Sequence, residues 1–333
     1  MYNDDDLNQA VEEGVFTASS VDDFRRLMSS NKNTSSIDEE NFKLVAGFND
    51  IFIVVACLLL LFSSLWVVKS LTDSSSISLV VVVVLSWVLA EFFVLKKRMA
   101  LPGIVLVLSF LSSVAVVSVA LIDDAKAFPL MAAAGITTVA AYLHWWRFKV
   151  PITVASAAMS AVVCVVSVLA EVYPDALDKV AFLSFVFGLL LFVFAMYWDA
   201  SDRSRTTHRS DVAFWIHLFS APLIIHSVFS LLGVLDGNES LASLSGVVFL
   251  YFVMTLVSIA INRRALMLSS LGYVLYALSN IVSTYGSVSH SLSLAGVVMG
   301  GALLLLSIYW GAARAALVST LPNKVKAYIP EVS

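Results

Sequence analysis

Charged residues are scarce in this chain of 333 residues. They make up 13% of the sequence, whereas a soluble protein contains about a quarter, and hydrophobic residues make up 59%. This composition excludes an ordinary soluble domain and predicts a membrane protein. Cysteine is scarce as well: Cys57 and Cys164 both fall in apolar stretches, which argues against a disulfide framework and a thiolate metal site.

The chain also lacks the sequence motifs of several enzyme classes. No G-x-x-x-x-G-K-[ST], G-x-S-x-G or H-E-x-x-H pattern occurs, so an ATP-driven pump, a lipase-like hydrolase and a zinc protease have no sequence support. We therefore assign no catalytic and no metal-ligating residue. A cleaved signal peptide is not expected either, because residues 1–50 are polar and acidic.

Ten apolar stretches follow one another from Ile51 to Trp310, each of roughly the length that a helix needs to cross a bilayer. They predict an all-α integral membrane bundle of about ten transmembrane helices. The expected spans are 51–68, 77–95, 101–122, 127–146, 151–172, 178–198, 212–235, 243–261, 265–285 and 292–312.

Lys and Arg are distributed unequally between the two sides of this predicted bundle. If residues 1–48 lie inside, 17 of the 20 basic residues fall on the inner side, and only Lys69, Lys126 and Lys179 fall on the other. The positive-inside rule then places both termini in the cytosol. We expect an acidic arm at 1–48, a transmembrane domain at 49–313 and a cytosolic tail at 314–333.

The acidic arm has a balance of charge that disfavours anionic partners. Residues 1–43 contain ten Asp and Glu against four Lys and Arg, so a nucleic acid or an anionic membrane surface is a poor partner. Ser20 with Asp23, and Ser36 with Glu39, have the spacing of a capping box, which predicts two short helices. The arm either docks a cytosolic protein or packs against the protein's own loops.

The arm and the entry to the first span also resemble a known group. The segment VEEGVF at 11–16 and the segment ENFKLVAGFND at 40–50, with the repeated helical hairpins, look like uncharacterised bacterial polytopic inner-membrane proteins that have a short acidic cytosolic leader. The resemblance implies a bacterial inner membrane. It brings no catalytic or binding residues.

The seventh span, at 212–235, contains two histidines and a proline. Pro222 lies near mid-depth, where its ring should free a backbone carbonyl and kink the helix. His217 and His226 are nine residues apart and so lie on opposite faces. Either the deeper His226 relays protons or both histidines hydrogen-bond to neighbouring helices. Haem ligation by His144 with His217 is a weaker alternative, and we expect no cofactor.

Polar residues also form a seam along the ninth span. Spacings of three and four residues place the seam on one helix face, which either lines a solute path or joins helices by hydrogen bonds. Its residues are Ser269, Tyr273, Tyr276, Asn280 and Thr284.

Ionisable residues from several spans gather near the predicted cytosolic face. They either form a shared polar vestibule or pair with basic neighbours, as Glu91 could with Lys96. The vestibule candidates are Asp50, Glu91, His144 and Asp211, together with Arg147, Asp199 and His217. The connection 199–211, the longest between spans, ends in Ser210 and Asp211, which are residue types that cap helices.

Span six and span ten have similar spacing of a glycine and an aromatic pair. Gly188 precedes Tyr197-Trp198 as Gly300 precedes Tyr309-Trp310. This shared spacing indicates either a parallel repeat or chance similarity. Gly296 and Gly300 also form a small-x-x-x-small pattern, which predicts close helix packing.

These features favour a secondary transporter or permease for a small solute, with coupling to protons, that lies in the lipid bilayer of a bacterial inner membrane. The alternative is a non-catalytic assembly or signalling protein that docks a cytosolic protein through residues 1–48. A membrane enzyme that acts on lipid or quinone is a third reading, less favoured than the other two.

Overall fold

A computed structural model describes residues 10–24, 48–122, 128–203, 205, 207–234, 240–286 and 290–330. The chain divides into two compact units, Met1–Asn41 with Glu331–Ser333, and Phe42–Pro330. Within the described ranges every regular element is a helix, so the predicted all-α class is confirmed.

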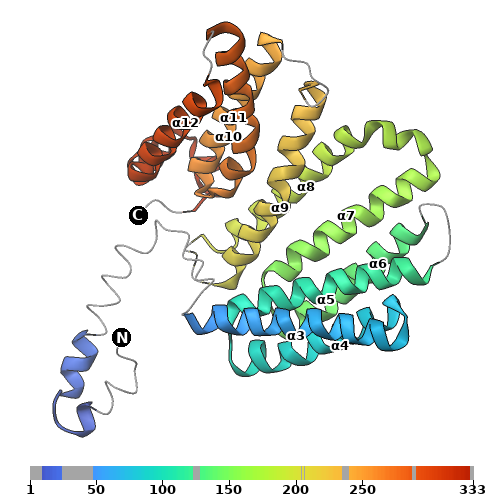
Figure 1. Cartoon of the computed structure of the whole chain (residues 1–333). Coiled ribbons are helices and arrows are strands. Elements are labelled where there is room, and N and C mark those ends of the chain that lie inside the picture. The colour runs from blue at the N-terminus through green and yellow to red at the C-terminus, as the bar shows by residue number, and fades with distance from the viewer. Residues whose placement is uncertain are drawn as a thin grey trace. The chain divides into compact units, whose positions relative to one another are not determined.

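The second unit is a series of long helices (Figure 1). Their order is α3 (Phe48–Thr72), α4 (Ser75–Ala90), a π-helical segment (Glu91–Lys96), α5 (Ala100–Leu121), α6 (Phe128–Phe148), α7 (Ile152–Val172), a 3-10 segment (Pro174–Lys179), α8 (Val180–Ala200), α9 (His208–Leu231), α10 (Leu241–Ile261), α11 (Ala265–Gly286), α12 (Ser291–Ile308), α13 (Trp310–Thr320) and α14 (Asn323–Lys326).

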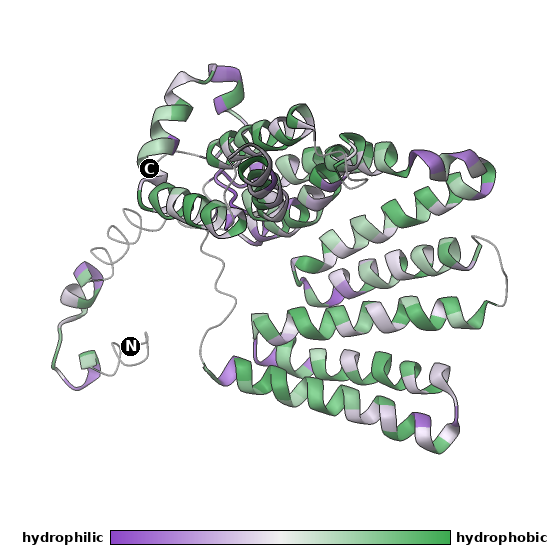
Figure 2. Ribbon diagram, turned by 45° about the horizontal axis from the view of Figure 1, so that its top comes forward, coloured by the Kyte–Doolittle hydropathy of each residue, from purple (hydrophilic) through white to green (hydrophobic). Residues whose placement is uncertain are grey.

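Nine helices in the described part of the chain are long and apolar enough to cross a membrane. Figure 2 shows hydrophobic residues along these helices and hydrophilic residues at their ends and connections. The helix predicted as the fourth span, α6, forms over 21 residues but is not among the nine. Thr137, Thr138, His144 and Arg147 reduce its apolar character, so the count of ten spans stays a prediction.

The helix α9 occupies a central place in the packing. It contacts α7, α8 and α11, and much of its surface is buried. The contact with α8 is the most intimate: a Cβ at Gly188 would come within 3.0 Å of the backbone nitrogen of Ile224. Only glycine lets the two helices approach so closely.

The start of α9 differs from the predicted start of the seventh span. α9 begins at His208, where Thr207 Oγ1 accepts a hydrogen bond from the backbone nitrogen of Arg209, so the predicted capping role of Ser210 and Asp211 is wrong. The helix then continues through Pro222 as one α-helix.

The acidic arm contains a short helical segment at 18–24. Thr17, rather than the predicted Ser20, caps it, because Thr17 Oγ1 accepts from the backbone nitrogen of Ser20 at 3.1 Å. The second predicted arm helix, with Ser36 and Glu39, lies outside the described residues.

At the C-terminal end, α12 stops at Ile308 and α13 continues to Thr320. Much of the segment predicted as a tail is therefore helical. Among the described residues, a Cβ at Gly296 or Gly300 would meet nothing within 4 Å. The close packing predicted for these two glycines is not found in the described part of the chain, where Gly300 differs from Gly188.

Candidate functional site

A buried ionic network joins the end of α8, the residue pair that follows α10 and the interior of α9. Asp199, one residue before the end of α8, accepts hydrogen bonds from Arg263, which follows α10, and from His217 of α9. Arg263 donates through Nη2 to Oδ1 and through Nε to Oδ2, the latter at 3.2 Å. His217 Nε2 lies 3.1 Å from Oδ2. Because the carboxylate only accepts, this geometry requires His217 to carry a proton on Nε2.

The network is withdrawn from solvent. The side chains of Asp199 and His217 are 0% exposed and that of Arg263 is 4% exposed. Burial of an ion is costly unless hydrogen bonds replace its hydration. Two further contacts contribute here: Arg263 Nη2 donates to the carbonyl of Ser210 at 2.9 Å, and Ser258 Oγ donates to the carbonyl of Arg263.

One atom of the network is left without a partner. His217 Nδ1 is buried and has no hydrogen-bond partner among the described residues. The ring of Phe192 packs against the imidazole, with 5.1 Å between the ring centroids. A neutral His217 leaves only a lone pair unsatisfied, whereas a protonated one would bury an N–H without an acceptor.

Two arginines of the connection between α8 and α9 bind backbone carbonyls of other segments. Arg205 donates to the carbonyls of Asn262 at 3.1 Å and Ile261 at 2.9 Å, at the end of α10. Arg203 Nε donates to the carbonyl of Ile329 at 3.1 Å. The last carbonyls of a helix have no partner within it, so a cation placed there stabilises the helix end.

Asn262 closes α10 in a left-handed conformation, with φ 55°. Its Oδ1 accepts a hydrogen bond from Trp310 Nε1 at 2.7 Å. Arg264 lies over the Trp310 ring at 4.9 Å. Nearby, Arg314 is 0% exposed and donates to the carbonyl of Pro330 at 2.7 Å. The junction that holds Arg263 is therefore fixed from α13 as well.

The structure brings together His226, the candidate for proton relay, and Tyr273 of the predicted polar seam. His226 Nδ1 of α9 lies 2.5 Å from the hydroxyl of Tyr273 on α11. Tyr273 also borders an open cavity of about 460 Å³, whose other lining residues are Val234, Ser269, Gly272 and Tyr276. Three residues of the predicted seam thus line one cavity.

The other predicted path residues do not line this cavity. Asn280 is half-buried further along α11, and Thr284 is exposed near its end. Pro222 lies between the two histidines on α9. His217 and His226 engage different partners, as their predicted placement on opposite faces requires.

Two of the predicted vestibule residues, Glu91 and Asp211, bind different neighbours. Glu91 forms a two-bonded ion pair with Arg147, at 2.9 and 2.7 Å, rather than with Lys96. Asp211 lies 3.4 Å from His208 Nδ1 on the same helix. Asp50, at the start of α3, is 5% exposed.

His144 is buried in an aromatic cluster. The rings of Trp87, Phe110 and Phe148 lie around it, and Thr153 Oγ1 is 3.5 Å from its Nδ1. His217 instead faces Asp199 and Phe192. The two histidines considered for haem therefore belong to different side-chain clusters, and the expectation of no cofactor stays a prediction.

The sequence predicted part of the buried network. His217 is a candidate from the sequence, and Asp199 is one of the predicted vestibule residues. Arg263 enters the sequence analysis only as one of the basic residues that predict the orientation. A signal was present in the chain: Asp199 is an acidic residue that directly follows the predicted span 178–198, where burial at the helix end would require a cationic partner.

No protein-family model, no curated protein and no solved structure matches this chain. Function is therefore argued from the geometry of its own residues.

Proposed function

We propose that this protein is a secondary transporter of a small polar solute, coupled to protons, in a bacterial inner membrane with both termini cytosolic. The observation that carries the proposal is the buried network of Asp199, His217 and Arg263. Ionisable residues within apolar membrane helices are costly and are typically retained for ion or proton pathways.

His217 is the proton-responsive group in this proposal. Its Nδ1 has no partner among the described residues, so a proton added there would bury a second N–H without an acceptor. That proton would also place a second positive charge beside Arg263. Both effects disfavour the buried arrangement of the network and favour one in which water reaches the His217 imidazole.

The helix α9 links this group to the cavity. His226 lies nine residues beyond His217, which is about 13 Å along the axis, and contacts Tyr273 at the cavity wall. A rigid-body shift of α9 that opens the network would therefore also move His226 against Tyr273.

The lining of the cavity suggests the class of solute. Two tyrosines, a serine, a glycine and a valine line it, and none of the described lining residues is charged. A volume of about 460 Å³ suits a small molecule. We therefore propose a neutral solute with hydroxyl groups, which the tyrosine and serine hydroxyls can bind.

Flux measurements in vesicles test this proposal. Purified protein is reconstituted with an internal pH dye, and external glycerol, inositol and glucose are added in turn. We expect one of these solutes to drive an internal pH change, His217→Asn to abolish that change, and Tyr273→Phe to weaken the apparent affinity for the solute.

His290→Asn is the matched control, because this exposed histidine precedes α12 away from both sites. It should retain the pH change and the affinity of the native protein. If none of the three solutes moves protons, or if His217→Asn leaves the flux intact, the proposal is wrong.

A second candidate function rests on the acidic arm. It belongs to a separate unit and exposes large apolar side chains at Val15 and Phe16, which are 66% and 50% exposed. An assembly or signalling protein would use such a surface to dock a cytosolic protein. Deletion of residues 1–36 should then abolish recovery of that partner and spare solute flux.

A further inference from the structure

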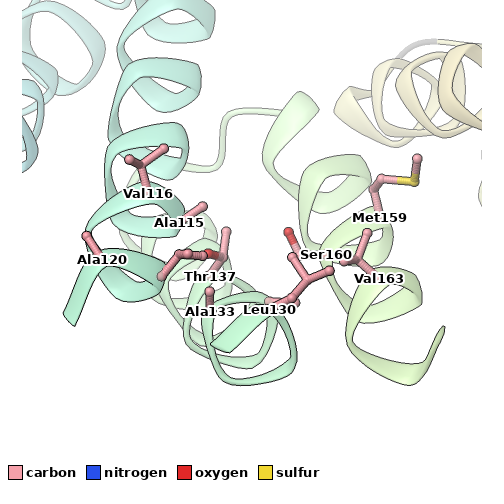
Figure 3. Close-up of a pocket in the computed structure, with 11 residues that line it drawn as sticks. Ala115, Val116, Ala120, Leu130, Ala133, Thr137, Met159, Ser160 and Val163 are labelled. Carbon is pink, nitrogen blue, oxygen red and sulfur yellow. The ribbon is translucent and has the colours of Figure 1, made fainter. Parts of the chain in front are cut away.

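A second cavity lies between α5, α6 and α7, in a part of the bundle that the proposed transport does not use. Its volume is about 490 Å³. Figure 3 shows the side chains of the three helices around it. The walls are small or aliphatic, with Ala115 and Val116 from α5, Ala133 from α6, and Met159 and Val163 from α7.

One polar group in this apolar cavity is unexplained. Thr137 lines it and is 5% exposed, yet its hydroxyl has no hydrogen-bond partner among the described residues. Threonine in a helix can bond to the carbonyl four residues earlier, and the neighbouring Thr138 does so with Ala134 at 2.8 Å. Thr137 makes no such bond among the described residues. Its oxygen is buried, so a rotation about the Cα–Cβ bond would bring the hydroxyl to a ligand in the cavity.

The surroundings of the cavity restrict the kind of ligand. α5 and α7 are apolar enough to span a membrane, and α6 packs against both. Val116 and Leu130 at the cavity are 54% and 52% exposed on these helices, so in a bilayer the opening would face lipid. A ligand must therefore enter from the bilayer.

The depth of Thr137 further restricts the kind of ligand. Thr137 lies nine residues into α6, which is about 13 Å from the helix start. With α6 as the predicted fourth span, this depth is well within a hydrocarbon core of about 30 Å. The ester carbonyls of phospholipids remain near the interface, so an acyl lipid does not present an acceptor at this depth. Ser160 of α7 also lines the cavity (Figure 3) and supplies a second hydroxyl.

We propose that this cavity binds a quinone-type molecule, an apolar ring with carbonyl acceptors and a hydrocarbon tail. Thr137 donates to one ring carbonyl, Ser160 faces the ring from α7, and the alanine and valine side chains contact the ring and tail. The proposal concerns binding alone and is independent of the proposed solute transport.

The test uses a decyl-benzoquinone with a photoreactive diazirine in its tail, added to the full chain in lipid nanodiscs. Mass spectrometry of the cross-linked peptides locates the probe, and competition by unlabelled decyl-benzoquinone gives its affinity. We expect labelling within 115–120 and 159–163. Ala133→Phe, which fills the cavity, should abolish it.

Thr137→Val, which keeps the side-chain volume, should weaken binding by about three- to tenfold, because it removes one hydrogen bond. Thr138→Val is the matched control and should leave binding unchanged. Thermal unfolding should show that Thr137→Val is as stable as the native protein, because no internal hydrogen bond is lost.

Decylbenzene, which has the tail but no carbonyl, separates specific binding from filling by bulk lipid. If it competes as well as the quinone, or if Thr137→Val and Thr138→Val bind alike, the cavity holds ordinary hydrocarbon and the proposal is overturned. Labelling that persists in Ala133→Phe has the same meaning.

Discussion

Replacement of Asp199 by Asn tests whether the buried network stabilises the folded bundle. The substitution keeps the shape of the side chain but removes its charge. Arg263 would then remain buried, 4% exposed, without the carboxylate that it binds directly. His217 Nε2 would lose its carboxylate acceptor. We expect Asp199→Asn to be strongly destabilising.

The magnitude follows from the burial of the pair. Removal of one partner of a buried ion pair costs about 3–5 kcal/mol, because the remaining charge is uncompensated. A loss of about 3 kcal/mol lowers the ratio of folded to unfolded protein by a factor of roughly 100. Arg263→Met should be costly for the same reason. The double variant should lose less than the sum of both, because it leaves neither charge unpaired.

The chain offers a matched control in Glu91 and Arg147. This pair has the same chemistry and good two-bonded geometry, but its side chains are 36% and 48% exposed. Exposed pairs contribute about 0–1 kcal/mol. Glu91→Gln should therefore cost about 1 kcal/mol or less, although it also removes a carboxylate from an arginine.

Unfolding in mixed micelles, followed by circular dichroism as the denaturing detergent fraction rises, gives the free energies of these variants. Asp199→Asn should unfold at a much lower detergent fraction than Glu91→Gln. If the two variants are equally stable, or if the effects of Asp199→Asn and Arg263→Met simply add, the buried network does not act as a coupled unit.

Three further predictions concern packing, the C-terminal segment and topology. Gly188→Ala should lower the free energy of unfolding, because a Cβ there meets backbone of α9, whereas Gly300→Ala should leave the free energy unchanged or raise it by up to about 1 kcal/mol; equal effects would contradict the packing described. Deletion of residues 327–333 should lower the unfolding midpoint, because the buried Arg314 and the half-buried Arg203 lose carbonyl acceptors; an unchanged midpoint would show that these bonds contribute little. In a cysteine-free background, an impermeant thiol reagent on intact cells should label Tyr173→Cys and not Ser201→Cys; the opposite pattern would invert the predicted orientation.

The long helices were predictable because hydropathy alone defines them. A bilayer leaves no water for backbone groups, so an apolar run of the right length must be helical. The expected span 101–122 corresponds to α5 at Ala100–Leu121, and 265–285 corresponds to α11 at Ala265–Gly286. α9 was less well predicted, because its start depends on a side-chain hydrogen bond of Thr207 that hydropathy does not report.

The partners within the site were not predictable in the same way. Asp199 and Arg263 are 64 residues apart in sequence, and their contact requires the end of α8 to lie beside the start of α11. Short connections indicate which consecutive helices are neighbours, but not which helices later in the chain return to them. Likewise, a histidine in an apolar span indicates that a polar partner is present but does not identify that partner.

The arginines that define the predicted orientation also bind within the fold. Arg205 donates to backbone carbonyls at the end of α10, Arg203 donates to a carbonyl of the C-terminal segment, and Arg263 binds a carboxylate and a carbonyl at once. Such multiple bonding needs the planar, five-donor guanidinium, which a lysine ammonium cannot replace. Charge alone would permit Lys at these positions, so the positive-inside count and the buried network impose different requirements. Arg263→Lys should therefore preserve orientation and still weaken the network, which separates the topological role of this residue from its structural one.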